Sequence, residues 1–142
     1  MLHTEVLSKE QRELLPFLKK FGKEYGFVGD TAIALHLGHK LEGSIKIPSL
    51  LTLAAMKAFA LGQRSKWKDY VDLYFIMKDH FTCAEIFQQA KALFAGEFNP
   101  KLFRMQLDYF GDVDYREKVQ FMPGFAVSEK KVQKALREFS LA

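Results

Sequence analysis

The residues best suited to do chemistry lie in the stretch "RSKWKDYVDLYFI", residues 64–76, and shortly before it. Asp69 and Asp72 are three residues apart, so in a helix they lie on one face. Lys57 is the only charged residue of the apolar stretch "LLTLAAMKAFALGQ" that precedes them, and Arg64 follows it. These four side chains could form one polar cluster lining a cleft. On this interpretation the two aspartates belong to an active site.

The same residues also have a structural interpretation. Carboxylates near the start of a helix are stabilised by the helix dipole, and Asp69 and Asp72 fall where a helix is expected to begin. Lys68 and Asp72 have the i,i+4 spacing of a surface ion pair, which contributes a few tenths of a kcal/mol. Spacing alone leaves both interpretations open.

Two further patterns have the spacing of a binding site. The turn around Gly29, Asp30 and Thr31 precedes a predicted helix, and amides at a helix start bind phosphates. Asp30 would place a negative charge where the phosphate sits, and it is also a good helix cap. His36 and His39 have a spacing that allows a metal pair, but no cysteine or other histidine nearby completes a zinc set. We therefore predict no metal site among the histidines.

Hydrophobic periodicity and cap residues predict a mostly α (α+β) fold with about six helices and two short strands. Residues 1–142 are predicted to form a single domain. The strands are expected at "FV" and "GSIKIP", and "GDVDYREKVQFMPGFAV" is expected to be a loop. Five helices are predicted after residue 48: over 50–63, from Arg64 to about His80, over 83–95 with a stop at Gly96, from Pro100, and from Ser128 to the end. The residues predicted to cap helix starts are Ser49, Thr82, Asn99 and Ser128.

The composition indicates a soluble cytoplasmic protein. The single cysteine, Cys83, excludes an internal disulfide, and no apolar run is long enough to span a membrane. The net charge is +4, but the lysines are spread along the chain, so nucleic-acid binding is only weakly indicated. Fourteen phenylalanines exceed what one small core buries, so we expect an exposed apolar patch and self-association as a homodimer.

Four stretches together resemble a known family. They are "LSKEQRELLPFL", "FVGDTAIALHLGHK", "SLLTLAAMKAFALGQRSKWKDYVDLYFIM" and "LDYFGDVDYREKVQFMPGF". In this order they are similar to successive blocks of the AbiEii-type nucleotidyltransferases, which are toxin components of bacterial abortive-infection and toxin–antitoxin systems. The third stretch is the most specific, because a lysine, an arginine and "KDxxDL" on consecutive helices form a family motif.

The resemblance implies a fold, a chemistry and a set of residues. The fold is a polymerase-beta-like nucleotidyltransferase core, here residues 1–48, followed by a helical bundle, here residues 49–142. The chemistry is transfer of a nucleotide from a nucleoside triphosphate with Mg²⁺. By resemblance, Asp69 and Lys57 are catalytic, and Lys68 and Asp72 support them. The residues expected to bind the nucleotide are Gly29, Thr31, Lys57 and Arg64.

The sequence departs from the family in one interval. In the family, a D-x-D pair that binds the metal follows the "LGH" helix, whereas here Glu42 is the only acid between Asp30 and Asp69. The chain therefore resembles a member with an internal deletion, truncated in its sheet and catalytically impaired. The "GSIKIP" strand, left with an open edge, could pair with the same strand of a second copy.

Two alternatives stay open beside this function. One is an active, nucleotide-binding transferase whose Mg²⁺ site is altered or completed by a dimer. The other is a structural helical module without a ligand, so that the chain has no cofactor. A toxin of this kind also implies an antitoxin protein as its partner.

Overall fold

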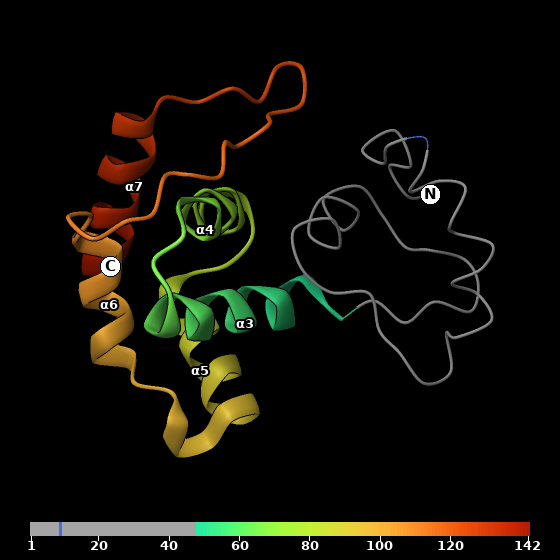
Figure 1. Cartoon of the computed structure of the whole chain (residues 1–142). Coiled ribbons are helices and arrows are strands. Elements are labelled where there is room, and N and C mark those ends of the chain that lie inside the picture. The colour runs from blue at the N-terminus through green and yellow to red at the C-terminus, as the bar shows by residue number, and fades with distance from the viewer. Residues whose placement is uncertain (1–8, 10–47) are drawn as a thin grey trace. The chain divides into compact units, whose positions relative to one another are not determined.

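Helices make up most of the computed structural model of this protein, which describes residue 9 and residues 48–142. The described part contains no strand. This confirms the mostly α fold class, while the predicted strands and the helices predicted before residue 48 lie outside the described residues. The helices are α3 (Leu50–Gln63), α4 (Trp67–Asp79), α5 (Cys83–Phe94), α6 (Pro100–Asp108) and α7 (Glu129–Leu141), and a 3-10 turn at Ala95–Glu97 joins α5 to α6 (Figure 1).

The chain divides into two compact units, Met1–Leu53 and Ala54–Ala142. Nearly all described residues belong to the second unit, and the account below concerns that unit. The expectation of a single domain, with residues 1–48 as one part and residues 49–142 as the other, stays a prediction. None of the described helices is long and apolar enough to cross a membrane.

Local capping signals fix where four of the helices begin. The Ser49 hydroxyl accepts a hydrogen bond from the Thr52 amide at 3.1 Å, and the Ser128 hydroxyl accepts one from the Lys131 amide at 3.3 Å. Thr82 forms a full capping box at the start of α5, and the Asn99 side chain accepts from the first two amides that follow Pro100. Each cap satisfies amides that a helix start leaves without partners. All four predicted caps are confirmed.

Two predicted helix limits are wrong. Helix α4 begins at Trp67 rather than at Arg64, because the preceding residues pair with a distant segment instead. The Trp67 amide donates to the Asp114 carbonyl at 3.0 Å, and the Asp114 amide donates to the Ser65 carbonyl at 2.7 Å. Helix α5 ends at Phe94 rather than at the predicted Gly96, because Ala95 adopts a positive φ of 48° that leaves the helical conformation.

Helix α4 is the centre of the bundle. Its Tyr70, Leu73 and Ile76 are fully buried, and α3 crosses beneath it in Figure 1. Helices α6 and α7 pack against each other, and α7 also packs against α4. Val132 and Leu136 form the buried face of α7, as its helical spacing predicts. Burial of α4 on several sides fixes the direction in which its charged side chains point.

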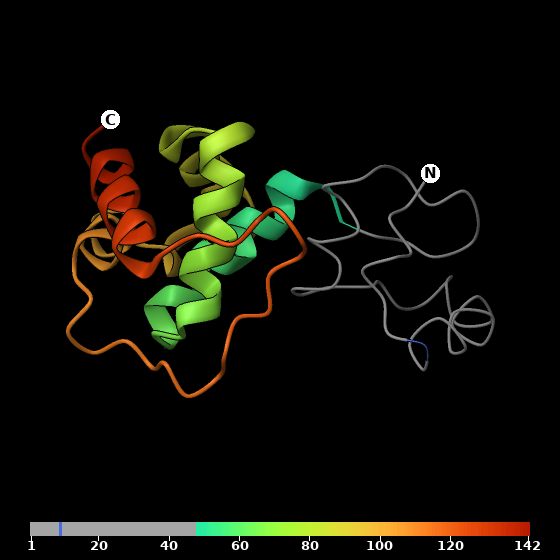
Figure 2. The same ribbon diagram turned by 90° about the horizontal axis from the view of Figure 1, so that it is seen from above.

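The predicted loop between α6 and α7 is confirmed, and we call residues 109–127 the strap. It crosses α4 on the side away from α3 in both views (Figures 1 and 2). Aromatic contacts hold it along α4: Tyr115 lies 5.2 Å from Trp67, and Phe125 lies 6.3 Å from Phe75, measured between ring centroids. Helix α4 is therefore held between α3 and the strap.

The cap of α5 gives a direct test of how much local signals contribute to stability. Thr82→Ala removes the hydroxyl that accepts from the Glu85 amide, and we expect a loss of about 1 kcal/mol in the free energy of unfolding in urea. Thr82→Ser keeps the hydroxyl and is the matched control, with a much smaller loss. Equal losses in both variants would contradict the capping explanation.

Candidate functional site

Three charged side chains meet between α3 and α4. The Lys57 Nζ lies 2.8 Å from Asp69 Oδ1 and 2.8 Å from Asp72 Oδ2. Lys57 comes from the middle of α3, and the two aspartates come from the first turns of α4. Their three-residue spacing puts both carboxylates on the face of α4 that meets α3. The polar cluster proposed from the sequence therefore forms, with Lys57 at its centre.

Burial explains why Lys57 needs both carboxylates. The Lys57 side chain is 8% exposed and that of Asp69 is 2% exposed, whereas Asp72 keeps 22% of its side-chain surface. A buried ammonium group loses its hydration, and this cost is offset only when opposite charges and hydrogen bonds replace the lost water. Helix α3 carries no other charged residue, so these ion-pair partners come from another helix, α4.

Arg64 completes the cluster at its edge. Its Nε donates to Asp69 Oδ2 at 3.2 Å, and its side chain is 53% exposed. Each oxygen of the buried Asp69 carboxylate therefore contacts a cation, Lys57 on one side and Arg64 on the other. With two cations and two carboxylates, the cluster of Lys57, Arg64, Asp69 and Asp72 is formally neutral.

Lys68 does not join this cluster. Its Nζ lies 3.3 Å from Glu117 Oε2, while Lys66 Nζ lies 2.5 Å from the other oxygen of the same carboxylate. These two lysines hold the pKa of Glu117 below its ordinary value. The predicted i,i+4 pair between Lys68 and Asp72 is not formed, because the strap supplies a partner for Lys68. Lys68 thus anchors the strap to α4.

Two groups near the cluster escaped the sequence analysis. Glu117 lies in an irregular segment, where no periodicity shows which residues it faces. Tyr70 is fully buried beside Asp69, and its hydroxyl donates to Gln106 Oε1 on α6 at 3.2 Å. Burial, with smaller contributions from nearby acidic groups, raises the pKa of Tyr70 to about 12. The polar side of α6 at Gln106 was the only sequence signal for this contact.

The other residues predicted for the site lie outside the described residues. These are Gly29 and Thr31, expected in the nucleotide loop, together with Asp30, His36 and His39. Their relation to Lys57 and Asp69 stays a prediction. Four of the residues that the resemblance implies lie together in the structure: Lys57, Arg64, Asp69 and Asp72. Lys68 lies apart from them.

The described residues do not fit an Mg²⁺–triphosphate site. Such a site needs carboxylates that converge on the metal ions. In residues 48–142, no three Asp, Glu, His or Cys side chains gather in a way that could hold a metal ion. Asp69 and Asp72 do lie together, but both are paired with Lys57, and the Asp69 carboxylate also contacts Arg64. What the arrangement of these four residues does is hold α3 and α4 together.

Comparisons with known proteins give one match. A family model described as nucleotidyl transferase AbiEii toxin, type IV TA system, matches residues 27–139, which is more than half of the chain. Comparisons with curated proteins and with solved structures gave no significant match. The matched range contains every residue of the polar cluster.

Removing the central cation should destabilise the fold. Lys57→Met leaves the buried Asp69 carboxylate without its main partner, and we expect a loss of about 3–5 kcal/mol in the free energy of unfolding, measured by urea denaturation. Arg64→Gln, at the exposed edge, should cost less than about 1 kcal/mol. A Lys57→Met loss no larger than that of Arg64→Gln would contradict the central role of Lys57.

Tyr70 should make the protein less stable at high pH. The folded state keeps the phenol neutral up to a pKa of about 12, whereas the unfolded chain releases the proton from pH 10 upward. The stabilisation is therefore fully present below pH 10 and is lost as the pH rises toward 12. Tyr70→Phe should flatten this dependence of the urea midpoint, while Tyr109→Phe, at an exposed phenol, should not.

Proposed function

Because the chain belongs to the AbiEii nucleotidyl transferase toxin family of type IV toxin–antitoxin systems, we propose that it is a family member that does not transfer nucleotides on its own. It serves instead as a binding or regulatory protein within such a system. The family implies an antitoxin as its counterpart.

The observation that carries this proposal is the charge balance of the polar cluster. Transfer of a nucleotide requires carboxylates that hold metal ions against the triphosphate. Asp69, the residue that the resemblance implies to be catalytic, contacts Lys57 with one carboxylate oxygen and Arg64 with the other. A metal ion at Asp69 would compete with Lys57 and Arg64 for the two carboxylate oxygens that these cations contact.

The sequence supports the same proposal independently. Glu42 is the only acid between Asp30 and Asp69, where the family carries its D-x-D strand. Asp69 and Asp72 lie on one helix, and the sequence offers no second pair of carboxylates near them that could converge on the same metal ion. The missing acids and the paired cluster both support the proposal that the chain keeps the helical bundle of the family without its chemistry.

A second candidate function is retained nucleotide binding. It is favoured by Arg64, whose half-exposed guanidinium lies at the edge of the cluster and can contact a phosphate without unfolding the core. On this alternative, a Mg²⁺ site altered in this chain or completed by a dimer would support transfer. The remaining alternative, a structural helical module, predicts no ligand at all.

Incorporation of labelled nucleotide tests the proposal. The purified protein is incubated with each of the four ribonucleoside triphosphates, Mg²⁺ and total RNA or protein as acceptor, and we expect no incorporation above a reaction without the protein. Isothermal titration calorimetry with each triphosphate and Mg²⁺ runs in parallel. Incorporation that is lost in Asp69→Asn, with circular dichroism showing an intact fold, would refute the proposal.

The calorimetry separates the remaining interpretations. Triphosphate binding weakened by Arg64→Gln, but unchanged in Arg116→Gln at an exposed arginine of the strap, would establish a nucleotide site that has lost its transfer chemistry. No heat with any triphosphate would favour a regulatory or structural role without a nucleotide.

A further inference from the structure

The strap divides at Asp114 into an anchored part and a more loosely held part. The Asp114 carbonyl accepts from the Trp67 amide at 3.0 Å, and the Asp114 amide donates to the Ser65 carbonyl at 2.7 Å. Beyond this point, no backbone hydrogen bond joins residues 115–127 to another described segment. We call residues 115–127 the outer strap. Its two fixed ends are Asp114 and Ser128, the cap of α7.

The outer strap buries very little of its own surface. Ten of its thirteen residues are exposed, and the other three, Val119, Phe121 and Val127, are only partly buried. Even Phe125, which contacts Phe75 of α4, is 57% exposed. Fixing each residue in one conformation costs conformational entropy, and burial of apolar surface is the main contribution that offsets this cost. We therefore expect this segment to open at a much smaller free-energy cost than the bundle.

One ion-pair cluster joins the outer strap to the start of α4. Of the three charged residues in the outer strap, Glu117 is the one that pairs with a described residue outside the strap. Its two oxygens lie 2.5 Å from Lys66 Nζ and 3.3 Å from Lys68 Nζ, and these lysine side chains are 36% and 34% exposed. Exposed pairs contribute little in general. In a segment with so little burial, however, they are a large share of what keeps it closed.

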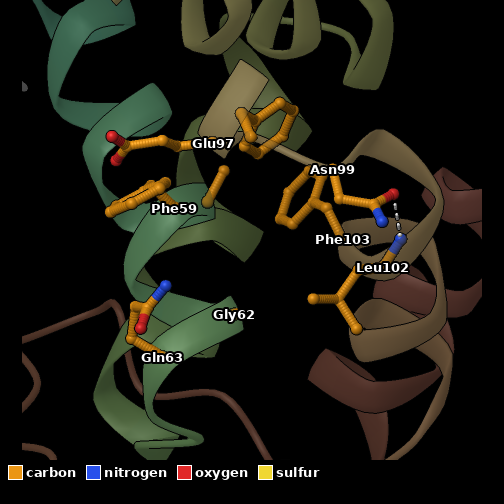
Figure 3. A pocket seen from close by; sticks show the side chains of 9 residues that line it. Phe59, Gly62, Gln63, Glu97, Asn99, Leu102 and Phe103 are labelled. Atoms are coloured by element: carbon orange, nitrogen blue, oxygen red, sulfur yellow. Dashed lines mark hydrogen bonds between the residues drawn. The ribbon is translucent and has the colours of Figure 1, made fainter. Parts of the chain in front are cut away.

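The packing of the helices does not depend on the outer strap. Where α3 meets α6, Phe103 is buried and Leu102 points across toward Gly62 (Figure 3). The pocket left there has a volume of only about 40 Å³. Helices α6 and α7 pack against each other, and α7 packs against α4. The helices can therefore keep their places when the outer strap opens.

We propose that the outer strap is a hinged lid, which swings away from α4 as one unit about its two fixed ends while the helices stay folded. The ion pairs of Glu117 act as its latch. Opening uncovers the face of α4 that carries Trp67 and Phe75, together with the two ammonium groups that Glu117 meets. None of these contacts involves the polar cluster, so the lid and the absence of nucleotide transfer are tested independently.

Cleavage by chymotrypsin measures the opening, because the protease binds an extended segment and cuts after Phe121 and Phe125 of the outer strap. When the lid closes faster than the protease cuts, the cleavage rate follows the population of the open form. Glu117→Gln removes the charge of the latch, and we expect cleavage about three- to tenfold faster than in the wild type, as loss of two exposed ion pairs predicts. Glu97→Gln, at an exposed acid outside the strap, should leave the rate unchanged.

A second variant removes the latch from the side of α4 and leaves the strap sequence intact. Lys66→Gln combined with Lys68→Gln should accelerate cleavage as much as Glu117→Gln does. Synthetic peptides of residues 112–127, with and without the Glu117→Gln change, give the intrinsic cleavage rate of each sequence and correct for any preference of the protease. Mass spectrometry of the first products confirms that the cut lies in the outer strap.

The urea dependence of cleavage separates opening of the lid from unfolding of the whole protein. Opening exposes little surface, so the corrected rate should change little in urea concentrations below the unfolding transition. Cleavage that requires global unfolding would rise with urea as steeply as the unfolding equilibrium followed by circular dichroism. That result would overturn the proposal, and so would equal cleavage rates in Glu117→Gln and Glu97→Gln.

Discussion

The arrangement of α3 and α4 depends on the burial of one ammonium group. Lys57 lies in an otherwise apolar helix that is buried on most sides, so its charge has to be balanced inside the protein. Among the described residues, Asp69 and Asp72 balance it, because they lie one turn apart on the face of α4 that meets α3. The register of α4 against α3 is therefore set by charge as well as by packing, since a shift along α4 would leave Lys57 beside apolar side chains.

The strap fixes the other side of α4 by different means. Backbone hydrogen bonds join Asp114 to Ser65 and Trp67, and the Glu117 carboxylate bridges Lys66 and Lys68. The exposed ion pairs contribute little, so the aromatic contacts to Trp67 and Phe75 carry most of the attachment. A segment without regular structure thus acquires a fixed course along α4.

Local features of this fold could be predicted from the sequence, and contacts between distant segments could not. Ser49, Thr82, Asn99 and Ser128 act within four residues of themselves, so their capping roles are readable in the chain. The cluster was half predictable: the shared face of Asp69 and Asp72 follows from spacing, but the choice of Lys57 over Lys68 as partner depends on how α3 crosses α4. Lys68 pairs with Glu117, far along the chain, and no periodicity in the strap indicates that pairing.

The family resemblance implies that Asp69 helps to hold Mg²⁺, whereas in the structure its carboxylate balances a buried lysine. These two roles make different demands on the carboxylate. An aspartate that holds Mg²⁺ must turn a lone pair toward the metal, and one that stabilises a buried lysine must turn it toward the ammonium. In this structure Asp69 and Asp72 both turn an oxygen toward Lys57, and the other oxygen of Asp69 faces Arg64. On the function proposed above, the residues of the family motif hold α3 against α4 rather than a metal ion.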